Sequence, residues 1–357
     1  MDLARICAMC GIIALHILGR GGVLDASQEN PAKHCIAWWL EICAYSSVDL
    51  FALLSGWLGI EKKHYSCYRI IELIAVVVTY SAVITGLFFV VNPGVFSSGK
   101  DVIKSLVPSL DGRYWYITCY IPLAFLQPYI NKMLLSLSVQ NHKKLCMVCV
   151  VFFSLMPSIT KVDLFRFSDG YSFAWLAVCY TIGAYLKREK NGKNHMVARK
   201  GTCMLIFLVC SAILAAGQAV YYAIFHRDTD YMITYCSPFI LLMAIAVIRF
   251  AADAEMKVGG QLFAKMSSAA FDVYVIHCHI LIFELVIGDH FQWISNMPAV
   301  LIPAVVIGLV VGLYITLGIV GICRCVLFEK ICLNGLLRKL SAIIDRKLVL
   351  RPTTGEN

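Results

Sequence analysis

Charged residues are scarce in this chain of 357 residues. Only 15% are Asp, Glu, Lys or Arg, against about 25% in an average soluble protein, which is too few to cover a water-exposed surface. Hydrophobic residues make up 60% of the sequence and come in long runs rather than in amphipathic stripes. A run of about 20 apolar residues is what a helix needs to cross the hydrocarbon core of a bilayer. The sequence therefore excludes an ordinary soluble protein and predicts an all-α, polytopic membrane protein.

Other features are also missing. The sequence contains no internal repeat, no low-complexity tract and no soluble domain, and Arg5 and His16 interrupt the first apolar run, which argues against a signal peptide. Most of the 16 cysteines lie inside apolar runs, where cysteine behaves as a small hydrophobe, so we expect no disulfide framework. Cys7 and Cys10 form a CxxC pair without the second pair of ligands that zinc usually needs, and we expect no metal.

Polar breaks divide the apolar runs into ten candidate spans. The connections 20–36 and 93–113 are long enough to form caps or re-entrant pieces. The ten spans are Leu3–Gly19, Ala37–Ile60, Ile71–Asn92, Tyr114–Ile130, Leu145–Thr160, Phe173–Leu186, Thr202–Phe225, Tyr235–Ile248, Ser267–Gly288 and Ala299–Cys323.

The basic residues give an orientation. With the amino terminus in the cytoplasm, the cytoplasmic loops and termini hold 23 of the 31 Lys and Arg residues, as the positive-inside rule requires. The net charge of +9 is thus explained without a nucleic-acid partner. We expect both termini to be cytoplasmic, with a transmembrane domain over 1–325 and a tail over 326–357. Within the tail, Leu333–Leu350 is predicted to be an amphipathic interfacial helix, with a polar side formed by Arg338, Lys339, Arg346 and Lys347.

Ionisable residues inside a bilayer are costly and therefore mark candidate functional sites. Arg5 and His16 stand eleven residues apart in the first span, about 16 Å along a helix and within about 20° of the same face. Asp2 lies one turn before Arg5 and can orient it. Two interpretations remain open: both side chains serve chemistry in a shared cavity, or Arg5 is a surface anchor and His16 a hydrogen-bonded packing residue.

The second and ninth spans carry further candidates. Asp49 falls near the middle of the second span, where it needs a proton or a cationic partner. Ser55 and Gly56 follow it and let another helix backbone approach closely. In the ninth span Tyr274 and His277 share a face, while His279 projects the other way, which argues against a shared metal site.

Four segments in order resemble acyltransferase family 3, a family of integral membrane proteins. Its opening Asp-x-x-Arg and R-x10-H pattern corresponds to Asp2, Arg5 and His16, and its V-D-x-F-F-x-x-S-G-F run to residues 48–57, with Ala52 and Trp57 as departures. Its basic segment and its aromatic segment have counterparts, although the usual proline after the basic segment is replaced by a region containing Glu72. The late Y-x-I-H motif is similar to Tyr274–His277. The counterparts of the basic segment are Lys62, Lys63 and Arg69. Those of the aromatic segment are Tyr114, Trp115, Tyr116, Tyr120, Pro128 and Asn131.

The resemblance implies an enzyme that transfers an acyl group, most often acetyl, from cytoplasmic acyl-CoA to a hydroxyl of a cell-envelope glycan. It implies a location in the bacterial plasma (inner) membrane, with acetyl-CoA as co-substrate. Arg5, Lys62, Lys63 and Arg69 would then bind the phosphates of CoA, because arginine and lysine are the usual phosphate ligands.

The expected chemistry centres on His16 as the general base for the acceptor hydroxyl. A transient acetyl-histidine is the alternative. We expect Asp49, His277, Tyr116 or Tyr274 to orient His16 or to stabilise the oxyanion, with Asp2 and Tyr120 as further orienting residues. Other functions also remain open: a transporter or flippase for a glycan or small solute, or an enzyme of the same fold with another donor or acceptor.

Overall fold

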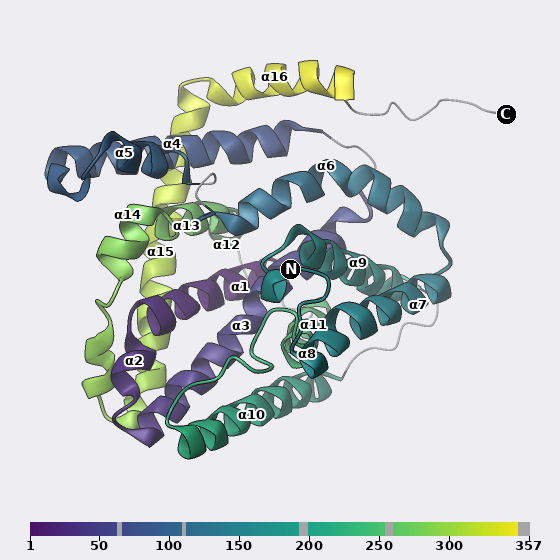
Figure 1. Cartoon of the computed structure of the whole chain (residues 1–357). Coiled ribbons are helices and arrows are strands. Elements are labelled where there is room, and N and C mark those ends of the chain that lie inside the picture. The colour runs from purple at the N-terminus through teal and green to yellow at the C-terminus, as the bar shows by residue number, and fades with distance from the viewer. Residues whose placement is uncertain (63–65, 109–111, 193–198, 254–259, 349–357) are drawn as a thin grey trace.

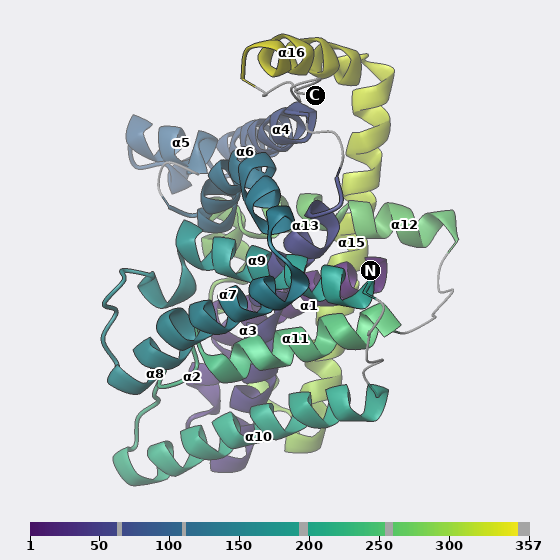
Figure 2. The ribbon, with the colours of Figure 1, turned by 90° about the vertical axis from the view of Figure 1, so that its right-hand side faces the viewer.

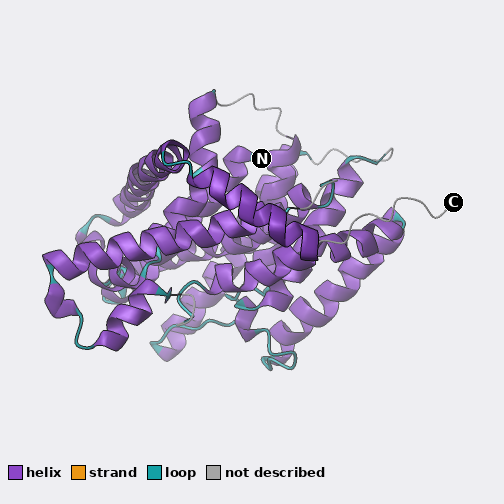
Figure 3. Ribbon diagram, turned by 90° about the horizontal axis from the view of Figure 1, so that it is seen from above, coloured by secondary structure: helices purple, strands orange, loops and turns teal. Residues whose placement is uncertain are grey.

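The computed structural model describes residues 1–62, 66–108, 112–192, 199–253 and 260–348, and every regular element in these ranges is a helix (Figure 3). Lys63 and residues 349–350 of the predicted tail helix lie outside the described residues. The all-α prediction is therefore confirmed for the described part of the chain.

The centre of the molecule is built on one long helix. α3 (Pro31–Gly59) packs against α1 (Asp2–Leu15), α9 (Phe173–Lys190), α10 (Lys200–Phe225) and α11 (Pro238–Asp253). In Figure 1 the two purple helices α1 and α3 lie side by side in the middle of the bundle. α1 continues into the π-helical segment η1 (His16–Arg20), and the short α2 (Val23–Ser27) leads into α3.

Glycines let α3 and α9 cross at close range. A methyl group on Gly56 would lie 1.9 Å from the carbonyl oxygen of Tyr180, and one on Gly183 would lie 2.0 Å from that of Leu53. Both distances are far below van der Waals contact, so only glycine fits at these two positions. The close approach expected at Ser55 and Gly56 is thus confirmed.

The remaining helices surround this centre. Figure 2 shows α15 passing steeply along one side of the bundle and α16 lying across its end, next to α4. α16 coincides with most of the segment predicted to be amphipathic. The bounds are α4 (Tyr68–Val91), η2 (Pro93–Val95), α5 (Gly99–Leu106), α6 (Trp115–Ser136), α7 (Val139–Val150), η4 (Val151–Leu155), α8 (Met156–Thr160), η5 (Ser168–Gly170), η8 (Ala299–Leu301), α15 (Ile302–Lys330) and α16 (Leu333–Leu348).

Six helical stretches in the described residues are long and apolar enough to cross a membrane. Helices α6, α9 and α11 also coincide with predicted spans, but they are not both long enough and apolar enough to cross a membrane. α6 contains Pro122, Pro128 and several polar residues, α9 ends in a basic turn, and α11 has 16 residues, fewer than the about 20 that a span needs. The six are Asp2–Arg20, Pro31–Gly59, Tyr68–Val91, Val139–Thr160, Lys200–Phe225 and Ala299–Lys330.

The ninth predicted span is broken. The stretch Gln261–His277 bends by 69° against Ile280–Asn296, so that this pair is a broken span or a re-entrant loop. At the break His279 takes an extended conformation and its Nδ1 accepts a hydrogen bond from the backbone of Leu281. The described residues thus support six to seven spans, and the predicted ten are not confirmed. The pieces are α12 (Gln261–Ser268), α13 (Ala270–His277), α14 (Ile280–Ile282), η6 (Phe283–Ile287) and η7 (Gln292–Asn296).

Candidate active site

A cavity of about 1630 Å³ runs through the centre of the bundle. Glu41 and Ser55 both line it, and they stand fourteen residues apart on α3, which corresponds to about 21 Å along the helix axis. Arg5 and His16 line it from α1 and η1. The shared cavity that the Arg5–His16 spacing predicts is therefore present.

One end of the cavity is basic. Arg5, Lys62 and Arg69 line it from the start of α1, the α3–α4 connection and the start of α4. Arg5 donates a hydrogen bond to Ser267 at 3.0 Å and lies 3.3 Å from the carboxylate of Asp2. Burial, together with the neighbouring charge of Arg69, lowers the pKa of the Lys62 ammonium below its ordinary value.

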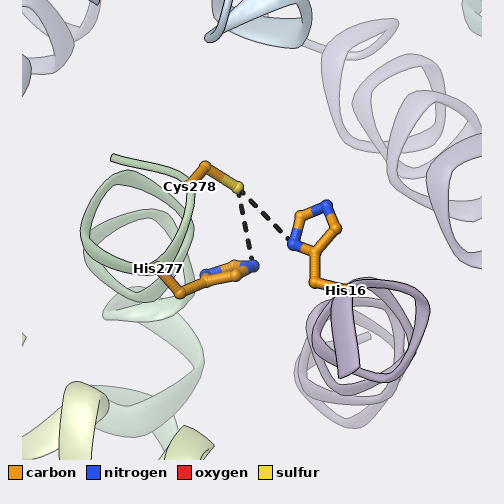
Figure 4. A group of neighbouring side chains, drawn as sticks. All are labelled: His16, His277 and Cys278. Carbon is orange, nitrogen blue, oxygen red and sulfur yellow. Dashed lines mark hydrogen bonds between the residues drawn. The ribbon is translucent and has the colours of Figure 1, made fainter. Parts of the chain in front are cut away.

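His16 meets His277 and Cys278 further along the cavity, where the break in the ninth span brings the end of α13 to η1 (Figure 4). The two imidazole rings have centroids 5.0 Å apart. The sulfur of Cys278 lies 3.9 Å from Nδ1 of His16 and 3.5 Å from Nε2 of His277. The other ring nitrogen of His16 points away from both neighbours (Figure 4).

A hydrogen bond to the backbone fixes His277. Its Nδ1 lies 2.5 Å from the carbonyl oxygen of Val273, one turn earlier on α13. Nδ1 therefore carries a proton, and Nε2 is left with a lone pair that faces Cys278. His277 is buried and not itself in the cavity wall, whereas His16 and Cys278 are. His279 faces elsewhere and bonds to the carbonyl oxygen of Ser105, as its spacing from His277 predicts.

In the described part of the chain, these three side chains form a group that could hold a metal ion. Their donor atoms all lie within 4.8 Å of one another, and two imidazoles with one thiolate are a ligand set that zinc accepts at open sites. Cys7 and Cys10 are free thiols on α1 and do not belong to this group.

Asp49 is not brought to this group. Its carboxylate is fully buried against α9, where Oδ1 accepts a hydrogen bond from Nε1 of Trp175 at 2.9 Å and lies 3.9 Å from the sulfur of Cys179. Asp49 is also absent from the cavity wall. In this geometry it joins α3 to α9.

Tyrosines predicted as orienting residues also line the cavity wall. Tyr116 stacks on Tyr120, with ring centroids 6.2 Å apart, and lies 6.3 Å from Tyr274. Tyr274 in turn lies 6.2 Å from the ring of His277. The hydroxyl of Tyr114 donates to the carbonyl oxygen of Val275 at 2.6 Å and ties α6 to α13.

Several cavity residues have no counterpart in the sequence-based prediction. Arg324 of α15 lines the wall and holds the buried carboxylate of Asp272 through two hydrogen bonds of 2.8 and 2.9 Å. Glu41, Tyr171 and Tyr235 also line the wall. Glu41 could have been found as a second acid within an apolar run. Tyr171 and Tyr235 lie in connections, and nothing in their local sequence indicates that they meet.

One comparison with known proteins found a match. A family model described as an acyltransferase domain matches residues 1–319 and so includes every side chain of the basic end, the His16 group and the tyrosine wall. No curated protein and no solved structure gave a significant match.

Proposed function

Because the chain belongs to acyltransferase family 3, we propose that it is an O-acetyltransferase that moves an acetyl group from acetyl-CoA to a hydroxyl of a polysaccharide, in the inner membrane of a bacterium. The observation that carries this proposal is the cavity itself. It joins a cluster of cations at one end to His16 deeper inside, whose Nε2 points away from Cys278 and His277 (Figure 4).

The basic end suits the donor. CoA carries several phosphate charges, and Arg5, Lys62 and Arg69 provide a guanidinium, an ammonium and a second guanidinium at one mouth of the cavity. Guanidinium groups bind phosphate with two parallel hydrogen bonds. Lys63, expected to act with them, keeps that role as a prediction from sequence. The narrow pantetheine arm would then extend along α1 toward His16.

Hydrogen bonds around His16 suit a general base. Nε2 of His277 accepts from the thiol of Cys278, and the sulfur of Cys278 accepts from Nδ1 of His16. This order leaves the lone pair of His16 on Nε2, the nitrogen that points away from both neighbours. Cys278 and His277 are therefore positioning residues for His16.

The reaction then follows a simple proton path. Nε2 of His16 takes the proton of the acceptor hydroxyl while the hydroxyl oxygen attacks the carbonyl carbon of the thioester. Collapse of the tetrahedral intermediate breaks the C–S bond, and the imidazolium returns the proton to the departing sulfur of CoA. The hydroxyls of Tyr116 and Tyr274, which line the same cavity, are the candidates to stabilise the oxyanion. In the alternative, Nε2 of His16 attacks the thioester carbonyl first and CoA leaves as the thiolate. The acceptor hydroxyl then takes the acetyl group from the acetyl-histidine.

Transfer of labelled acetyl groups tests the proposal. Purified protein in nanodiscs should move label from acetyl-CoA to polysaccharide of the host envelope, and His16→Ala should lose about 10²–10⁴-fold in rate, the usual contribution of a general base. Fluorescence-detected gel filtration would check that the variant is folded. Activity of His16→Ala near wild type would contradict the role of His16. Transport of unmodified glycan without acetylation would favour the flippase instead.

A further inference from the structure

Glu41 is a buried acid with unused hydrogen-bonding capacity. Its side chain is 6% exposed, it lines the cavity, and its Oε2 has no hydrogen-bond partner among the described residues. Buried polar atoms are normally satisfied, because leaving one without a partner costs free energy. A buried carboxyl oxygen that faces a cavity without a hydrogen-bond partner can therefore accept a hydrogen bond from a hydroxyl group of a ligand.

The position of Glu41 places that ligand next to His16. A methyl group on Gly19 would lie 3.6 Å from Oε1 of Glu41, and Gly19 belongs to the same π-helical segment as His16. The carboxyl group thus lies within about one helical turn of the proposed base. π-Helical segments are frequent at functional sites because they re-aim side chains.

Aromatic rings surround the same end of the cavity. Trp115 lies 4.7 Å from Tyr171 and stacks on Tyr235 at 5.9 Å, with ring planes 21° apart. Tyr171 and Tyr235 are 4.9 Å apart, and Tyr235 is 5.3 Å from Tyr45. These rings come from α3, α6 and two connections, and all of them line the cavity. They form one platform, called here the ring platform, with apolar faces and polar hydroxyl edges.

We infer that Glu41 and the ring platform bind a pyranose ring of the acceptor. The apolar C–H face of the sugar lies on the rings, and hydroxyls next to the reacting one donate to the carboxyl of Glu41. This inference rests on the proposed function, since it names the subsite that presents the acceptor to His16. A fatty alcohol has one hydroxyl and would leave Glu41 unpaired, and a peptide serine offers no flat apolar face to the rings.

Substitution of Glu41 by leucine separates binding from folding. Glu41→Leu keeps a side chain of similar size and removes the buried unpaired oxygen, so its melting temperature should equal or exceed that of wild type. Its KM for the acceptor should rise by roughly tenfold or more, because a site built to pair hydroxyls loses its acceptor. Ser237→Ala is the matched control: Ser237 also has a buried oxygen without a partner among the described residues, but it lies outside the cavity wall.

Binding measured without donor makes the test independent of catalysis. The probes are methyl glycosides of glucose, galactose, mannose and N-acetylglucosamine at high millimolar concentration, with 1-octanol as the hydroxyl control. At least one glycoside should raise the melting temperature of wild type and of Ser237→Ala by mass action, and none should raise that of Glu41→Leu. Equal shifts in Glu41→Leu, no shift in wild type, or a shift with 1-octanol alone would overturn the subsite.

A second pair of variants covers the case in which Glu41→Leu does not fold. Trp115→Phe keeps a ring on the platform and should retain the glycoside shift, whereas Trp115→Leu should lose it while Kd for CoA stays within about twofold. Equal responses of the two Trp115 variants would also overturn the inference. Glycoside binding without acetyl transfer would support the subsite and contradict the proposed function. Acetyl transfer that is unaffected by Glu41→Leu would support the proposed function and contradict the subsite.

Discussion

The sulfur of Cys278 lies 3.9 Å from Nδ1 of His16 and, on its other side, 3.5 Å from Nε2 of His277. A thiol can accept from one neighbour and donate to the other, so in the proposed hydrogen-bond order Cys278 places the proton of His16 on Nδ1. In this proposal the tautomer of His16 depends on Cys278, a residue that touches no substrate in the proposed mechanism.

Cys278→Ala should lower kcat by about tenfold with little change in KM for acetyl-CoA, because His16 loses its tautomer preference but keeps its position. Cys278→Ser should restore most of kcat, since a hydroxyl also donates and accepts. Steady-state kinetics of the three proteins would check this. If the serine variant is no better than alanine, Cys278 acts through packing and the hydrogen-bond order is wrong.

The donor end should show a specific pH dependence. The lowered pKa of Lys62 means that this ammonium loses its charge at a lower pH than an ordinary lysine. Phosphate binding should weaken as pH rises through that value, so KM for acetyl-CoA should increase on the alkaline side. Lys62→Arg should move this increase to higher pH, because a guanidinium stays charged. An unchanged alkaline profile would show that Lys62 does not contact the donor.

Arg5 allows a further test of the same end. Arg5→Lys keeps the charge but loses the planar guanidinium, whose Nη1 donates to both Asp2 and Ser267, so we expect a partial rise in KM, and a larger one in Arg5→Ala. Binding of CoA measured by calorimetry would separate donor recognition from catalysis. Equal affinity of wild type and Arg5→Ala for CoA would exclude Arg5 from the phosphate site.

Asp49 distinguishes a catalytic from a structural carboxylate. Asp49→Asn retains an oxygen for the indole N–H of Trp175 and should keep kcat within a few-fold of wild type, whereas Asp49→Leu should lower stability by about 1–3 kcal/mol through the unpaired indole. Acetyl transfer and thermal unfolding of both variants give the answer. A loss of activity in a stably folded Asp49→Asn would support the catalytic role expected from sequence.

The buried pair of Asp272 and Arg324 should dominate stability near α13. Arg324→Met leaves a carboxylate that is 1% exposed without its cation, a change that typically costs about 3–5 kcal/mol. Asp272→Asn together with Arg324→Met should recover much of this loss, because no charge is left unpaired. Thermal unfolding in one detergent measures both, and a double variant no better than the single one would refute the explanation.

Local patterns account for part of the site and not for the rest. The spacing of Arg5 and His16 on one helix was enough to predict that both face one cavity, because helical geometry fixes their relative direction. The direction of Asp49 was not predictable, since α3 is apolar on most sides and carries no stripe that marks the cavity face. The break after His277 was missed because the run on either side of it is as apolar as an unbroken span.

The number of membrane spans was also only partly predictable from the sequence. Helices α6, α9 and α11 coincide with predicted spans, yet prolines, a basic end or short length separate them from the six qualifying stretches. Hydropathy locates helices well but does not say how they tilt or whether they cross the bilayer completely. The ring platform is harder still, because Tyr171 and Tyr235 meet only through the packing of distant connections.

A structure with a donor analogue tests the central claim most directly. Electron cryomicroscopy of the protein in nanodiscs with a non-hydrolysable thioether analogue of acetyl-CoA should show the phosphates at Arg5, Lys62 and Arg69, with the acyl-bearing end beside Nε2 of His16. Density with the acyl end away from His16, or on the lipid-facing surface of the bundle, would contradict the account.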